Sequence, residues 1–77
     1  MLNSRFATNQ VHDHIQLITA EQLGGILGVS VRTVWRLRSA GKLPLPVQLG
    51  GSIRWKRGEV EAWIDANCPN LENWLSS

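Results

Sequence analysis

The chain has little that would support a disulfide-stabilised, secreted or membrane-spanning protein. Its 77 residues include a single cysteine, Cys68, so an intrachain disulfide is excluded and a reducing compartment is the simplest interpretation. No apolar run approaches the ~20 residues that a membrane helix needs. The N-terminal residues also lack the apolar core of a signal peptide. We therefore expect a cytoplasmic protein with no membrane partner.

Residue sets typical of catalytic, cofactor or metal sites are lacking as well. No Ser-His-Asp set, carboxylate pair or glycine-lysine phosphate loop stands out, so we expect neither an enzyme nor a bound cofactor. His12 and His14 flank Asp13, but two histidines without a third ligand nearby are a weak signal, and we expect no metal site. Cys68 has no basic neighbour that would make its thiol reactive.

Acidic residues are missing from the middle of the chain. Residues 29–58 contain seven basic side chains and no acidic one, whereas all six acidic residues lie outside this block. The formal net charge of +2 says little alone. A basic block with acidic flanks, however, predicts a positive face directed at an anionic partner such as nucleic acid.

The length allows one small domain. Residues 1–16 are polar and lack periodicity, so we expect a flexible arm. Apolar periodicity begins near residue 17, and we place the folded domain at residues 17–68. Residues 69–77 form a tail in which the apolar spacing predicts one helical turn.

Two short helices are predicted at the start of this domain. The first spans residues 20–27, begins after the N-cap Thr19 in capping-box spacing, and ends at Gly28. The second spans residues 31–40 and begins after the N-cap Ser30. The short connection "GVS" predicts that the two helices pack as a helix-turn-helix.

A β-hairpin is predicted next, with strands at residues 47–49 and 53–55 around the loop "GGS". A two-residue turn would place Val47 opposite Arg54 and mix apolar with charged side chains on one face. A three-residue loop would instead place Val47 opposite Trp55 and gather the apolar side chains on one face. We expect this second register, because a slip of one residue inverts every side chain.

A third helix is predicted at residues 57–67, with an apolar stripe of Val60, Trp63 and Ile64, and it ends before Pro69. The fold class that follows is mainly α with a small β-hairpin, in the arrangement of a winged helix-turn-helix.

The second helix carries the first part of a candidate DNA-binding surface. If Val34 and Leu37 anchor it to the first helix, Arg32 and Arg36 point away from the core, where a guanidinium can reach guanine N7 and O6 in the major groove. Hydroxyls and free N–H groups at the helix start are phosphate ligands. A solvated basic face is the alternative that the helix alone leaves open. The candidate residues here are Ser30, Val31, Arg32, Thr33, Trp35, Arg36 and Arg38.

The hairpin carries the second part, as a wing beside the recognition helix. Glycines at its tip let the backbone approach a phosphate, and its basic residues would lie over the DNA backbone or in the minor groove. A hairpin that only closes the core is the alternative, and the two roles are compatible. Trp35 could contact the DNA backbone or pack against this wing. The candidate wing residues are Gly50, Gly51, Ser52, Arg54 and Lys56.

These signals occur in a familiar order over residues 17–64: "GVSVRTVWR", then "GKLPLPVQLG", then "IRW" followed by "EVEAWI". In that order the sequence resembles the AlpA-like phage regulators and the small excisionases, whose winged-helix domain is related to that of the MerR regulators. The resemblance implies sequence-specific DNA binding by a protein of a phage, prophage or mobile element. Such proteins activate or repress a promoter, or bend DNA during excision. The chain departs from the pattern at Gly24 and Gly25, where better helix formers are expected.

Partner identity leaves further alternatives open. A winged-helix scaffold can also serve as a protein-interaction module, with the basic face on an acidic partner and Leu71, Trp74 and Leu75 as a docking patch. Trp74 fits equally a core position or a dimer contact. One domain reads only a few base pairs of double-stranded DNA, so a homodimer or a head-to-tail cooperative assembly would increase specificity. For a DNA-binding protein of this kind, the cytoplasmic location would be the bacterial nucleoid.

Overall fold

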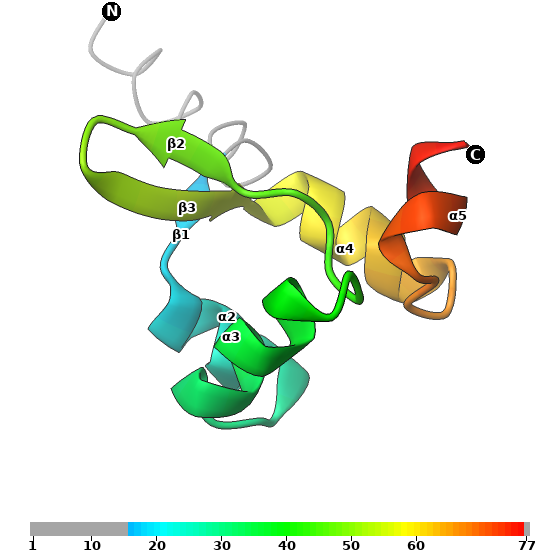
Figure 1. The fold of residues 1–77 in the computed structure, drawn as a ribbon, viewed down its shortest axis with the longest axis horizontal. Coiled ribbons are helices and arrows are strands. Elements are labelled where there is room, and N and C mark those ends of the chain that lie inside the picture. The colour runs from blue at the N-terminus through cyan, green and yellow to red at the C-terminus, as the bar shows by residue number, and fades with distance from the viewer. Residues whose placement is uncertain (1–15, 77) are drawn as a thin grey trace, which may run out of the picture.

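The computed structural model describes residues 16–76, which form a mainly helical fold with a small antiparallel sheet (Figure 1). The predicted fold class, a winged helix-turn-helix, is confirmed. The three strands lie in the order β1-β3-β2, and α2 packs side by side with α3. The elements are β1 (Leu17–Ile18), α2 (Ala20–Leu27), α3 (Val31–Ser39), β2 (Val47–Leu49), β3 (Ser52–Lys56), α4 (Arg57–Asp65) and α5 (Leu71–Leu75).

Helix α2 begins and ends where its sequence predicts. The Thr19 side chain accepts a hydrogen bond from the Gln22 N–H at 3.0 Å, and the Gln22 side chain accepts one from the Thr19 N–H at 2.9 Å. This capping box satisfies two backbone donors that have no partner inside the helix. Gly28 closes the helix in the left-handed conformation, with φ 73°.

The two glycines of α2 have different surroundings. Gly24 is buried, and a Cβ there would lie 2.7 Å from the carbonyl oxygen of Val29. The Val29 N–H also donates to the Gly24 carbonyl at 2.9 Å, so the turn before α3 lies directly on this residue. Gly25 is exposed, and a Cβ there would meet nothing within 4 Å. The close approach of the turn therefore requires glycine at position 24 alone.

The predicted register of the hairpin is wrong. The strands pair Leu49 with Ser52, Gln48 with Ile53 and Val47 with Arg54, around a two-residue turn. The expectation assumed that both strands bury one face, but β2 is an edge strand with little buried surface to fix its register.

Turn geometry decides the register instead. Gly50 has φ 61° and is the one central residue of the turn with positive φ, which is the pattern of a type II′ turn. The turn thus places Val47 and Arg54 on the outward face of the sheet, and Gln48 on the face of Ile53.

Strand β1 was not predicted, and it makes β3 the central strand. Leu17 pairs with Lys56 and Ile18 pairs with Trp55. The Arg57 N–H extends this pairing by donating to the Gln16 carbonyl at 2.8 Å. A strand of two residues is too short to show an alternating pattern in the sequence. The hairpin wing is therefore held in place by β1, which pairs with β3 along the edge opposite β2.

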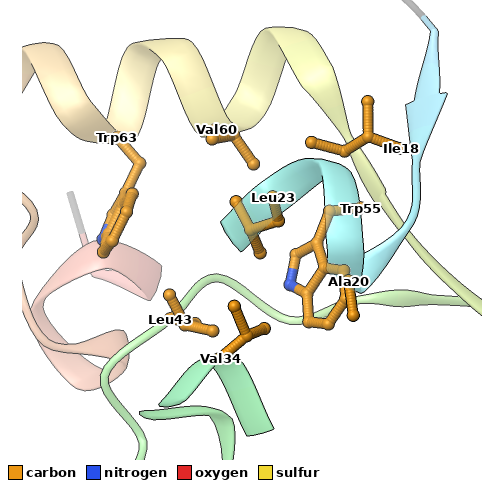
Figure 2. Packing of buried hydrophobic residues seen from close by; sticks show 8 residues of the cluster. All are labelled: Ile18, Ala20, Leu23, Val34, Leu43, Trp55, Val60 and Trp63. Carbon is orange, nitrogen blue, oxygen red and sulfur yellow. The ribbon is translucent and has the colours of Figure 1, made fainter. Parts of the chain in front are cut away.

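A single apolar cluster joins every layer of the fold. Figure 2 shows Leu23 of α2 between Val60 of α4 and Val34 of α3, with the Trp55 indole beside it. Trp55 also donates its indole N–H to the Pro44 carbonyl at 2.9 Å. The buried members are Ile18, Ala20, Leu23, Val34, Leu43, Trp55, Val60 and Trp63.

Helix α4 has the predicted stripe but ends at Asp65, before the predicted boundary at residue 67. Asn67 and Cys68 both have positive φ, and the Cys68 N–H donates to the Trp63 carbonyl at 2.9 Å, so the chain reverses before Pro69. This closure is of the kind seen at helix C-termini with a left-handed residue.

The helical turn expected in the tail is α5, and it packs on the domain. The Leu71 N–H donates to the Gly41 carbonyl at 2.9 Å. Trp74 lies against the core cluster and donates its indole N–H to Glu59 at 3.0 Å. Of the two roles considered for Trp74, the structure therefore supports packing within the chain.

Some expectations fall on residues that the structure does not describe. The arm at residues 1–16 lies outside it except for Gln16, and so does the His12–His14 pair. Within residues 16–76, no helix combines the length and hydropathy that crossing a bilayer requires.

Candidate nucleic-acid interface

Helix α3 has one face in the core and a basic face in solvent. Val34 is completely buried, and Leu37 packs partly against the cluster. Arg32 and Arg36 are exposed and lie four residues apart, which places them on the same side of the helix. Arg38 is half-buried. The structure therefore exposes two of the three predicted arginines and half-buries the third.

The start of α3 is exposed and is capped by a side chain. The Ser30 hydroxyl accepts a hydrogen bond from the Thr33 N–H at 3.1 Å and donates to the Thr33 hydroxyl at 3.1 Å. This cap uses one first-turn donor, whereas the N–H groups of Val31 and Arg32 have no acceptor inside a helix. Together with the positive end of the helix dipole, these groups suit an anion such as a phosphate.

The tip of the wing is an exposed two-glycine turn. Gly50 and Gly51 are both exposed, and the Gln48 side chain donates to the Gly50 carbonyl at 3.3 Å. Ser52 follows the turn and is half-buried. Leu49, which the expected register placed on the apolar face, is 56% exposed beside the tip. Only the turn chemistry of the glycine pair could have identified this exposure from the sequence.

The basic residues of β3 lie on its outward side. Arg54 is half-buried, and its guanidinium donates to the Ile53 carbonyl at 2.9 Å. Lys56 is exposed and pairs across the sheet with Leu17. Because alternate residues of a strand share a face, Ser52, Arg54 and Lys56 project together, away from the buried Trp55.

Trp35 links the two halves of the surface. Its ring centroid lies 5.6 Å from that of Trp55, with the planes inclined at 50°. The side chain is nevertheless 40% exposed. This geometry supports the interpretation that Trp35 packs against the wing, and contact with DNA stays a prediction.

Two basic residues of the acid-free block lie outside the predicted surface. Arg57 begins α4, where its guanidinium donates to Glu61 at 3.3 Å and to the Gln16 side chain at 3.2 Å. The Arg57 guanidinium is therefore already engaged within the protein. The charge pattern alone would have counted it toward the positive face. Lys42 is exposed just beyond α3 and is a basic residue that the candidate set omits.

Comparison with known proteins identifies a family. A protein-family profile described as a helix-turn-helix domain matches residues 17–68. No curated protein and no solved structure matches the chain.

Proposed function

The chain belongs to the helix-turn-helix domain family, and from this premise we propose that it binds double-stranded DNA with sequence specificity. Helix α3 enters the major groove, where Arg32 and Arg36 contact base edges. The wing formed by β2 and β3 lies along the sugar-phosphate backbone or in the minor groove.

The division of α3 into two faces is the observation that carries the proposal. Val34 fixes one side of the helix in the core, so Arg32 and Arg36 stand in solvent on another side. Like charges at i and i+4 repel, and α3 contains no acidic residue to offset them. A helix with only one sign of charge gains stability when a polyanion neutralises it.

Selection of bound duplexes from a random library, followed by titration of the selected site, tests the proposal. Arg32→Ala or Arg36→Ala should cost about 1–3 kcal/mol and relax the base preference. Arg54→Ala should weaken binding more evenly across sequences. With about five phosphate contacts, the plot of log affinity against log salt should have a slope of about −4 to −5.

Arg57→Gln is the matched control for net charge. It removes the same single charge, but from a guanidinium that already contacts Glu61 and Gln16. It should therefore leave the base preference unchanged. If the double variant Arg32→Ala/Arg36→Ala bound the selected site as tightly as the unaltered chain, the assignment of α3 would be wrong.

We extend the proposal to the biological role that the resemblance over residues 17–64 implies. The protein is a transcriptional regulator or an excisionase-type DNA-bending factor of a phage, prophage or mobile element, and it acts at the bacterial nucleoid. Its domain is of the AlpA-like, MerR-related type. Bend angles measured by circular permutation of the selected site distinguish these roles, because an excisionase-type factor should bend the site strongly. A straight site combined with a changed reporter output would favour a regulator.

A homodimer or a head-to-tail assembly on DNA would supply the specificity that one domain lacks. Light scattering of the protein with duplexes of increasing length tests this expectation. A dimer requires two protomers on one symmetric site, whereas head-to-tail assembly adds protomers as the duplex lengthens.

Docking of an acidic protein partner receives less support. The patch predicted at Leu71, Trp74 and Leu75 does not form as expected, because Trp74 packs on the core and Leu71 is half-buried. Leu75 alone remains largely exposed, at 63%.

A further inference from the structure

The Trp35–Trp55 contact joins the recognition helix to the wing. Helix α3 is fixed to the core through Val34, on the side that packs against α2. The adjacent residue, Trp35, extends toward the sheet and places its ring 5.6 Å from the ring of Trp55. Residues next to one another on a helix point about 100° apart. The two anchors together therefore fix the rotation of α3 about its own axis.

Trp55 is a rigid base for this contact. It is completely buried in the central strand, opposite Ile18, and its indole N–H donates to the Pro44 carbonyl at 2.9 Å. Pro44 is itself buried, in the connection that leads from α3 to β2. A side chain that rests on Trp55 is thereby positioned relative to the whole sheet.

Each ring of the pair is next to an arginine in the sequence. Arg36 follows Trp35 on the outer side of α3, and Arg54 precedes Trp55 on the outward face of β3. The contact between the rings therefore relates the backbone that carries Arg36 to the backbone that carries Arg54. A duplex has fixed groove and phosphate spacings, so it can be contacted by both arginines only when their separation is correct.

We propose that Trp35 is a positioning residue, which aligns the wing with the recognition helix so that both engage one duplex. This inference rests on the proposed DNA binding. Trp35 acts here through Trp55 and not by touching DNA. Trp35 rests on the buried Trp55 with one side of its ring and remains 40% exposed on the other.

A double-mutant cycle on the selected duplex tests the inference. Trp35→Ala should reduce affinity about as much as Arg54→Ala, and should lower the salt slope by about 1 for each wing phosphate contact that is lost. In the Trp35→Ala background, Arg54→Ala should then cost less than about twofold, because the wing is already disengaged. Trp35→Phe keeps a ring on Trp55 and should restore both the affinity and the salt slope.

Circular dichroism and thermal denaturation verify that each variant is folded at the assay temperature. Trp35→Leu replaces Trp35→Ala if the alanine variant does not fold. Losses from Trp35→Ala and Arg54→Ala that simply multiply would overturn the inference, because they would indicate direct and independent contacts. Unaltered affinity in a folded Trp35→Ala chain would overturn it as well. If the unaltered chain bound no duplex even at low salt, the proposed function would fail, and this inference with it.

Discussion

Gly24→Ala and Gly25→Ala each add one methyl group to α2, and they should change the free energy of unfolding in opposite directions. Gly25→Ala places a Cβ in open space on α2, where alanine is the better helix former. Gly24→Ala places a Cβ 2.7 Å from the Val29 carbonyl oxygen, a backbone atom that cannot rotate away. The two substitutions have the same helix propensity and differ only in their surroundings.

The structure sets the size of each effect. Gly25→Ala should raise the free energy of unfolding by about 0.5–1 kcal/mol, the difference in helix propensity. Gly24→Ala has the same gain, but it overpacks the turn at a cost of roughly 1–3 kcal/mol. A backbone contact this short belongs to the upper part of that range, so the net loss should be about 1–2 kcal/mol. For a domain of this size, each kcal/mol shifts the melting temperature by about 4–8 °C.

Thermal denaturation followed by circular dichroism, together with urea titration, measures both effects. The melting temperature should rise for Gly25→Ala and fall for Gly24→Ala. DNA affinity should fall for Gly24→Ala, because the displaced turn carries the start of α3. A Gly24→Ala chain as stable as the unaltered one would refute the close approach of the turn to α2. A fall of the same size in both variants would show that the helix, and not the turn, determines the response.

Four other substitutions test local contacts and turn geometry. Trp55→Phe removes the donor to the buried Pro44 carbonyl and also leaves a cavity, because phenyl is smaller than indole, so it should lower the free energy of unfolding, measured in urea, by at least about 1–3 kcal/mol. Gly50→Ala should cost about 1–2 kcal/mol because φ is 61° there, whereas Gly51→Ala should be nearly neutral; equal melting temperatures would contradict the turn geometry. Ser30→Ala removes the α3 cap and should lower the free energy of unfolding by about 1 kcal/mol. An unchanged melting temperature would contradict that role.

Local signals predicted the helices well because their ends are determined by neighbouring residues. The capping box at Thr19 and the left-handed Gly28 fix both ends of α2 without help from the rest of the chain. Ser30 does the same at the start of α3. The outward direction of Arg32 and Arg36 followed from helical periodicity once Val34 was assigned to the core.

The sheet was predicted less well because its determinants are distant or conflict with one another. Nothing near Leu17 indicates that it pairs with Lys56. For β2, the alternation of apolar residues favours a three-residue loop, whereas the glycine pair favours a two-residue turn. The two-residue turn prevails because Leu49 has no core to enter. The Trp35–Trp55 contact depends on that sheet, so its geometry could not be derived from local pattern.

The first strand pairs with a partner far along the chain, and this has a consequence for folding kinetics. Helices α2 and α3 can associate through local contacts, whereas Ile18 must find Trp55 across both of them. Closure of so long a loop costs entropy before the pairing compensates for it, so we expect this pairing to form late in folding. Weakening β1 should therefore accelerate unfolding and leave the refolding rate nearly unchanged, a pattern that stopped-flow chevron plots would reveal.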